Sequence, residues 1–256
     1  MGQWWKLGMT ALVFAPLGTA VAAPVETATE TRTIDPRTVR VKLDGLVDLK
    51  LRQGPVAALV ITGDKDLLAR TSIDQKGDTL IIGASSGTFT FKRRSQGVRA
   101  ELTLPQLREV SSDSMGTADV SGFTGEALAL NLEGAGAMKV TCNYRTVTAV
   151  LGGVGSMQIA SDNVELMDLN LRGAGYMTLK GTARSLKANL GGLGSLNADQ
   201  FHADTVTLDL SGLGNASVSA RQNANLSLSS LGSVSVHGRP VNRNVSVSGL
   251  GKITWK

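Results

Sequence analysis

Residues 149–159 read Ala-Val-Leu-Gly-Gly-Val-Gly-Ser-Met-Gln-Ile, two alternating apolar segments that meet at a Gly-Val-Gly corner. Similar corners, with an apolar residue directly before a glycine, recur through the second half of the chain. The second glycines of these corners are separated by 20, 19, 20, 19, 20, 18 and 19 residues. They are Gly116, Gly136, Gly155, Gly175, Gly194, Gly214, Gly232 and Gly251. A fixed period of this length is typical of a solenoid, in which each repeat stacks on its neighbours.

The segments on both sides of each corner predict β-strands with one buried face. Ala149, Leu151, Met157 and Ile159 share one phase of a period-two alternation, which is the spacing of side chains on one face of a strand. A rung of about 20 residues at ~3.3 Å per residue has a circumference of ~65 Å, which suits a three-sided coil with a dry interior. We therefore predict an all-β fold: a right-handed parallel β-helix of 19–20-residue rungs.

Glycine is expected at the corners because the backbone there needs either a positive φ or a close approach to the next rung. The middle residue of each corner, directly before the second glycine, is always apolar and would point outward in a flat strand, so we expect the corner either to turn it inward or to stack it into a ladder. These middle residues are Ala135, Val154, Ala174, Leu193, Leu213, Leu231 and Leu250. Phosphate binding by a glycine loop is not favoured, because the motif repeats and no helix follows it.

Two further columns follow from the same register. Ten residues before the second glycine of a corner, acidic and basic residues alternate over five successive rungs. They are Glu126, Arg145, Glu165, Arg184 and Asp204. Stacked as neighbours, these charges would oppose a slipped register, which brings like charges together. An outward column of short polar side chains is either a solvated ladder or a surface for a repeating ligand. Its members are Asn131, Asn170, Asn189, Asp209, Ser227 and Ser246.

The chain divides into four segments by composition. A lysine, an apolar run and small residues predict a signal peptide over residues 1–23, and 24–37 then reads as a linker. Residues 38–105 alternate without the glycine anchor, including a hairpin around Lys76-Gly77-Asp78, and we interpret them as an N-terminal β-rich cap region. The β-helix repeats occupy residues 106–256. The mature chain is therefore expected to be exported, without a membrane span, to the periplasm or the cell surface.

Charge and cysteine content argue against several functions. The formal net charge is +5, and the densest basic cluster, Lys92-Arg93-Arg94, is typical of a solvated turn, so no nucleic-acid partner is expected. The single cysteine, Cys142, shares the phase of Met138 and Val140 and is expected to be a small buried hydrophobe. Neither a metal, a cofactor nor a disulfide framework is indicated.

Several stretches of the first half carry a family resemblance. They are Gly45-Leu-Val-Asp-Leu-Lys-Leu-Arg-Gln-Gly54, Ile61-Thr-Gly-Asp-Lys-Asp-Leu-Leu68, Lys76-Gly-Asp-Thr-Leu-Ile-Ile82 and Leu102-Thr-Leu-Pro-Gln-Leu107. Followed by repeated Gly-Ala-Gly or Gly-Leu-Gly corners, this succession resembles the auto-transporter adhesin head domain family, also called the head GIN domain. The resemblance covers residues 38–256. It implies a right-handed parallel β-helix in an exported bacterial protein, whereas fold alone does not establish function.

The function that these patterns favour is a non-catalytic, adhesin-like binding module of the bacterial cell envelope, with a glycan or an envelope protein as partner. A self-assembling structural envelope protein is an alternative, because the last strand, 252–256, lacks a polar cap. A polysaccharide lyase or hydrolase is a further one, which would need paired carboxylates. Asp162, Glu165 and Asp168 form the densest acidic group, but their expected neighbours are mixed, and His202 and His237 have no companions. No catalytic residue is therefore assigned, and neither the ligand-binding residues nor the oligomeric state can be named.

Overall fold

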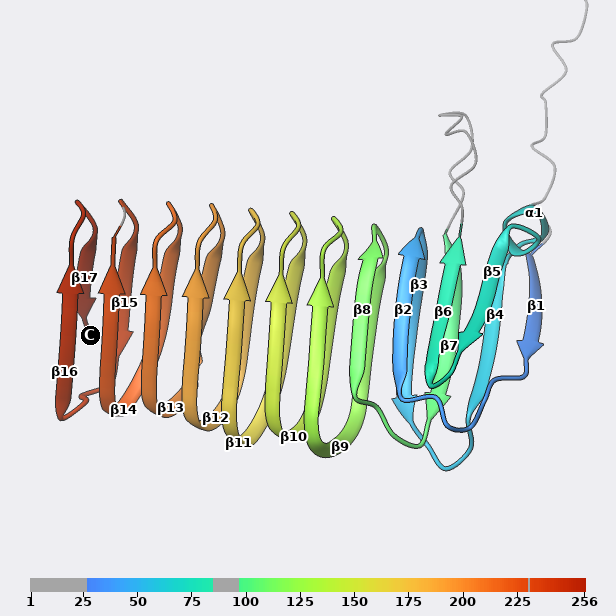
Figure 1. Ribbon diagram of the computed structural model, residues 1–256, viewed down its shortest axis with the longest axis horizontal. Coiled ribbons are helices and arrows are strands. Elements are labelled where there is room, and N and C mark those ends of the chain that lie inside the picture. Colours follow the sequence, from blue (N-terminus) through green and yellow to red (C-terminus); the bar gives the residue numbers. More distant parts are fainter. Residues whose placement is uncertain (1–26, 85–96, 230) are drawn as a thin grey trace, which may run out of the picture.

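The computed structural model describes residues 27–84, 97–229 and 231–256, and they form a nearly all-β solenoid of about 7 turns (Figure 1). A single 17-stranded sheet winds around the coil. The strands are β1 (Thr27–Arg32), β2 (Arg40–Gly45), β3 (Val47–Gln53), β4 (Ala58–Asp64), β5 (Thr71–Lys76), β6 (Thr79–Ala84), β7 (Val98–Leu104), β8 (Glu109–Ser114), β9 (Thr117–Leu132), β10 (Ala137–Leu151), β11 (Ser156–Leu171), β12 (Tyr176–Leu190), β13 (Ser195–Leu210), β14 (Asn215–Leu228), β15 (Ser233–His237), β16 (Asn242–Val247) and β17 (Lys252–Trp255). One helical turn, α1 (Lys65–Leu68), completes the described elements.

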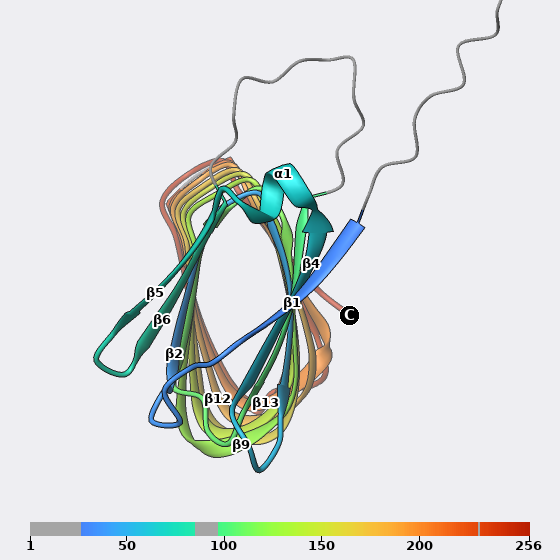
Figure 2. The ribbon, with the colours of Figure 1, turned by 90° about the vertical axis from the view of Figure 1, so that its right-hand side faces the viewer.

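Each long strand makes almost a whole turn of the coil. β10 begins after one glycine corner, bends between Cys142 and Thr146, and ends at the next corner, and it pairs in parallel with β9 and β11 along both halves. Seen along its axis the coil is a flattened oval with two long sides (Figure 2). The expected three-sided cross-section is therefore wrong, because the stretch opposite the glycine corner continues the strand around a bend instead of forming a third face.

The interior is filled by the phase of side chains that the alternation predicts to be buried. In β10, Met138 and Val140 from one long side and Ala149 and Leu151 from the other are each at most 1% exposed. Parallel pairing places like residues directly above one another, as in Met138 opposite Met157. This burial of stacked aliphatic side chains is the main favourable contribution to stability, and it confirms the predicted all-β solenoid.

The corner glycines are required by close approach between rungs. A Cβ built on Gly173 would lie 1.8 Å from the carbonyl oxygen of Gly153, and one on Gly192 would lie 2.0 Å from that of Gly173. Within the described residues, the glycines with φ in the left-handed range lie outside the Gly-apolar-Gly corners: Gly45, Gly77, Gly122, Gly181 and Gly238. Of the two reasons expected for glycine, the close approach of neighbouring backbones is the one that the fold uses.

The first rungs are not stacked in sequence order. β2 and β3 lie between the β6–β7 rung and the rung formed by β8 and the start of β9, with parallel pairing on both sides (Figure 1). β1, β4 and β5 add antiparallel pairs at this end of the coil, and β5 and β6 form the predicted hairpin at Gly77. β1 lies within 24–37, the stretch expected to be a linker. The predicted boundary of the cap region at residue 105 stays a prediction.

The proposed signal peptide, 1–23, lies outside the described residues. Among the elements that the structure does describe, there is no helix with the length and hydropathy needed to cross a membrane.

Candidate functional site: an apolar ridge and groove on the corner edge

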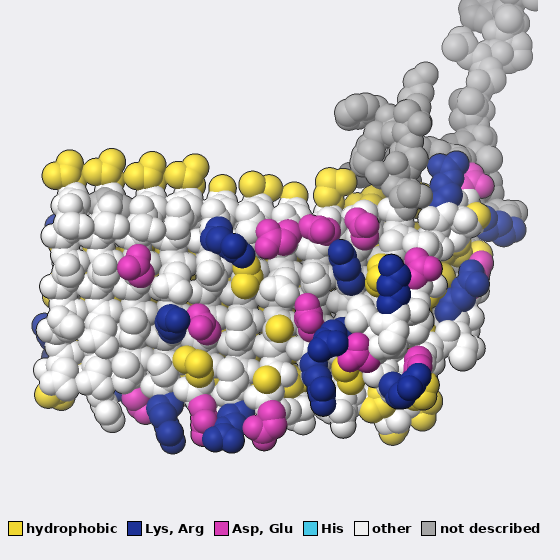
Figure 3. Space-filling model, in the orientation of Figure 1, with side chains coloured by type: hydrophobic (Ala, Val, Ile, Leu, Met, Phe, Trp, Pro, Cys, Tyr) yellow, Lys and Arg dark blue, Asp and Glu magenta, His cyan; other side chains and the backbone are white. Residues whose placement is uncertain are grey.

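The middle residues of the corners form a straight row of exposed side chains along one edge of the coil (Figure 3). We call this row the corner ridge and include the equivalent residue of the first corner. Its members are Met115, Ala135, Val154, Ala174, Leu193, Leu213, Leu231 and Leu250. The six larger side chains are between 54% and 86% exposed. The alternative that the corner turns these residues inward is therefore wrong, and the alternative that they stack into a ladder is confirmed.

The backbone on both sides of the ridge holds these side chains outward. The amide of Leu193 donates a hydrogen bond of 3.1 Å to the carbonyl of Gly173, and the amide of Leu213 donates one of 3.1 Å to the carbonyl of Gly192. After each corner, a second bond fixes the start of the next strand, as from the amide of Ser195 to the carbonyl of Gly175 at 3.1 Å. Since the interior is already full, the corner residue can only project into solvent.

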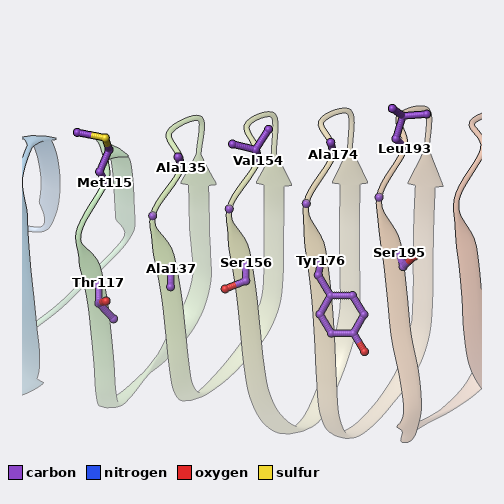
Figure 4. A pocket seen from close by; sticks show the side chains of 14 residues that line it. Met115, Thr117, Ala135, Ala137, Val154, Ser156, Ala174, Tyr176, Leu193 and Ser195 are labelled. Carbon is purple, nitrogen blue, oxygen red and sulfur yellow. The ribbon is translucent and has the colours of Figure 1, made fainter.

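A shallow groove of about 600 Å³ lies beside the first five ridge positions (Figure 4). Its floor is formed by the outward residue that follows each corner. These residues are Thr117, Ala137, Ser156, Tyr176 and Ser195. Tyr176 is 45% exposed and is the only aromatic residue that lines the groove, whereas its neighbours are small. Ala135 and Ala174 leave the groove open toward the ridge, because their side chains are shorter than those of Val154 and Leu193.

Charge is distributed unevenly along the ridge. The exposed residue two positions before each ridge residue is Asp113, Glu133 and Arg172 at three of the first four positions. Beside the last four ridge residues the same position is small and uncharged. It is occupied there by Gly191, Ser211, Ser229 and Ser248. The four consecutive leucines at the C-terminal end of the ridge therefore stand between uncharged residues, with Lys252 after the last corner as the exception.

The polar column predicted from the sequence is present, on one long side of the coil. Asn170, Asn189 and Asp209 are opposite one another in successive strands, and Ser227 and Ser246 continue the line. Val150 lies between Asn131 and Asn170, so the column is interrupted. A small hollow of about 210 Å³ lies beside Asp209, Ser227 and Ser246. The column has the stacked geometry of a polar ladder, and its role as a binding surface is untested.

The charge ladder is formed in part. Arg145 is 2.8 Å from Glu165 and 3.6 Å from Glu126, and the register places Arg184 beside both Glu165 and Asp204. The hydrogen bond from Arg145 holds the pKa of Glu165 below its usual range. Asp204 also pairs with Arg221 of the following rung, at 3.6 Å.

The acidic group considered for catalysis is divided among different partners. Asp168 lies 3.7 Å from Lys187, and Asp162 accepts a hydrogen bond from Thr182. His202 and His237 each hydrogen-bond to a serine, Ser219 and Ser217. In the described part of the chain, no three His, Cys, Asp or Glu side chains are grouped so that they could hold a metal ion.

Cys142 lies in the interior, as its alternation phase predicts. It is 8% exposed, and burial raises the pKa of its thiol to about 11. The sulfur is therefore a packing group and not a nucleophile.

A second hollow, of about 780 Å³, lies at the opposite edge, between the 105–108 segment and the bend of β9 and β10. Tyr144 borders it, but its hydroxyl donates a 2.6 Å hydrogen bond to the carbonyl of Leu107, and its ring lies against Gly125. The Tyr144 hydroxyl therefore holds the 105–108 segment against the bend and is not free to bind a ligand.

These features define the class of protein: a parallel β-solenoid whose most distinctive exposed feature is a continuous apolar edge. The chain belongs to the family described as "Putative auto-transporter adhesin, head GIN domain", whose model matches residues 39–240. The family resemblance noted in the sequence is thereby confirmed.

Solved structures of similar fold support the same architecture. A "putative adhesin" from Parabacteroides distasonis is 18% identical, with a TM-score of 0.77 over 90% of this chain and 97% of that chain. One from Parabacteroides merdae is 17% identical, with a TM-score of 0.76 over 89% and 96%. A "putative lipid binding protein" from P. distasonis is 19% identical, with a TM-score of 0.77 over 89% and 96%. No match was found among curated proteins. At these identities the similarity shows the fold alone.

The orientation of the ridge was not resolved by sequence reasoning. The signal was present, because the middle residue falls on the outward phase of the alternation in every corner yet is apolar in every corner. An apolar residue that recurs on a solvent-facing phase indicates a contact surface.

Proposed function

We propose that this protein is an exported, non-catalytic binding module of the bacterial cell envelope that contacts an envelope or surface partner through its corner edge. The observation that carries the proposal is the corner ridge, in which six large apolar side chains that the fold does not need for its core are more than half exposed in a line. Exposed apolar surface of this kind marks an interaction site in proteins.

Two other features support a binding role. Family membership associates the chain with proteins described as adhesins, and the pattern of residues 1–23 is that of an export signal. The carboxylates considered for lyase or hydrolase chemistry face separate cationic or hydroxyl partners, so they do not form the acid and base pair that such chemistry needs. Enzymatic activity is therefore not part of the proposal.

The experiment is a binding assay with isolated envelope fractions. Labelled protein is incubated with bacterial outer membranes, peptidoglycan sacculi and surface polysaccharide, and bound protein is measured as a function of concentration. We expect saturable binding to at least one fraction, with affinity at least tenfold lower for the ridge variant Leu193→Ser/Leu213→Ser.

A matched control removes apolar surface elsewhere. Val56 and Val241 are 69% and 85% exposed. Val56 lies in the loop between β3 and β4, and Val241 directly precedes β16, both at the edge opposite the ridge (Figure 1). The variant Val56→Ser/Val241→Ser should bind like the unchanged protein. Absence of saturable binding to every fraction, or equal losses in both variants, would contradict the proposal.

A further inference from the structure

We propose that the partner of the corner ridge is a lipid bilayer surface, into which the ridge inserts its side chains along a line parallel to the solenoid axis. This inference rests on the proposed function, because it names the chemistry of the partner that the same edge contacts. Four features of the ridge favour a bilayer: its shape, its hydrogen bonding, its flanking residues and the charge of the chain.

The ridge is convex and only one side chain wide. Eight positions spaced by the distance between neighbouring strands span ~34 Å, a long straight edge with no walls of its own (Figure 3). A rigid partner, such as a second copy of this chain, would touch such an edge along a line. Stable protein interfaces bury about 800 Å² on each partner, which needs a broader surface. A bilayer surface is deformable and closes around the inserted side chains from both sides.

Backbone amides of the corner edge are hydrogen-bonded within the protein, which suits a lipid environment that offers few hydrogen-bond partners. Amides at the ridge and directly after it donate to carbonyls of the preceding rung: Leu193 to Gly173, Leu213 to Gly192, and Lys252 to Gly232, at 3.1–3.2 Å. A polar group without a partner is costly in lipid, so only segments whose backbone groups are paired internally enter it readily.

The residues beside the C-terminal half of the ridge can approach lipid at low desolvation cost. The two residues on each side of Leu193, Leu213, Leu231 and Leu250 in the sequence are glycine, serine or asparagine, except for Lys252. Lysine can place its ammonium group at lipid headgroups while its stem lies along apolar surface. The acidic Asp113 and Glu133 lie at the other end, so the leucine end is expected to insert more deeply.

The charge of the chain favours an anionic bilayer. The formal net charge is +5. A net positive charge attracts a protein to the anionic headgroups of such a bilayer.

Flotation with lipid vesicles tests the inference. The full-length protein is mixed with protein-free vesicles of phosphatidylethanolamine and phosphatidylglycerol, and the fraction that floats with the lipid in a density gradient is measured. We expect the unchanged protein and the Val56→Ser/Val241→Ser control to float, and flotation of Leu193→Ser/Leu213→Ser to fall at least fivefold. Circular dichroism melting of each variant confirms that the fold is retained.

A second readout reports where the contact lies. An environment-sensitive dye attached at Leu213→Cys should shift its emission to shorter wavelength when vesicles are added, and the same dye at Val241→Cys should not. Failure of the unchanged protein to float, equal flotation of both serine variants, or equal dye shifts at both positions would overturn the inference.

The two proposals fail in different ways. If the ridge variant loses binding to sacculi or polysaccharide while the unchanged protein does not float with pure lipid, the edge is a binding site but not for a bilayer. Concentration-dependent self-association that disappears in the ridge variant, without flotation, would identify a second copy of the chain as the occupant and overturn the lipid inference.

Discussion

The carbonyl oxygen of Gly194 lies 1.8 Å from the position that a Cβ on Gly214 would occupy. The two glycines hold the same place in successive corners, and their backbones approach to a distance that excludes any side chain. The corner edge is therefore shaped by contacts between rungs, and substitutions there should separate residues that set the geometry from residues that only project from it.

Gly214→Ala should destabilise the protein strongly. The added methyl group must displace the backbone of the neighbouring rung, and overpacking of this kind costs about 1–3 kcal/mol or more in free energy of unfolding. Gly191→Ala, whose Cβ would meet its nearest neighbour, the hydroxyl of Ser211, at 3.7 Å, should leave the stability nearly unchanged. Urea unfolding followed by circular dichroism compares the two, and equal losses would contradict the close-approach explanation.

Leu210→Ala and Leu213→Ala should differ although the residues are three positions apart. Leu210 is fully buried, so its truncation leaves a cavity and should cost about 2–5 kcal/mol. Leu213 is 58% exposed, and its truncation should change the stability by no more than about 0.5 kcal/mol. The midpoints of denaturant unfolding measure both effects. A large loss for Leu213→Ala would show that the ridge serves stability and not contact.

Arg145→Glu should destabilise the solenoid more at low salt than at high salt. Arg145 forms ion pairs with both Glu126 and Glu165, and the substitution replaces it with a third negative charge between them. Salt screens the resulting repulsion because the charges are exposed. Arg145→Gln, which removes the attraction without adding repulsion, should have a smaller and less salt-dependent effect. Thermal melting at two ionic strengths provides the comparison, and a salt-independent result would argue against a charge ladder.

Asp35 should titrate at an unusually low pH. The side-chain hydrogen bond from Arg37 is the largest influence that lowers the pKa of the Asp35 carboxyl, from 3.8 to about 2. Because the folded-state pKa lies below the ordinary value, the stabilisation from this pair is fully present above pH 3.8 and is lost as the pH falls toward 2. NMR titration should show the pKa rising toward 3.8 in Arg37→Gln, and an unchanged value would refute the assignment.

Cys142 should resist thiol reagents while the protein is folded. With its pKa raised to about 11 by burial, little thiolate exists at pH 8, and the sulfur is also shielded from the reagent. Labelling with a disulfide reagent should be slow in buffer and fast in guanidinium chloride, which exposes the same thiol. Equally fast labelling in both conditions would place Cys142 outside the interior.

Much of the fold could be predicted from local patterns. The recurrence of the glycine corners gives the rung length, and the alternation identifies buried residues such as Met138, Leu151 and Cys142. The same register predicted the pairing of Arg145 with Glu126 and Glu165. These features are accessible because parallel stacking repeats one local pattern, so that sequence spacing translates directly into spatial neighbours.

Only part of the candidate site could be predicted from the sequence. An alternation defines two faces but not how a corner rotates its middle residue, so Leu193 and Leu213 could have turned inward or outward until the packed interior and the rung-to-rung hydrogen bonds were known. The groove around Tyr176 likewise depends on residues from successive rungs.

By itself, the sequence determined the strand-rich repeat, its period and its buried face, because these are set by interactions within a rung and between equivalent residues. Only the tertiary structure decided that the coil has two long sides, that β2 and β3 lie between rungs that follow them in sequence, and that the corner leucines face solvent. Each of these depends on which distant segments pair and how much space the interior leaves, and no local pattern contains that information.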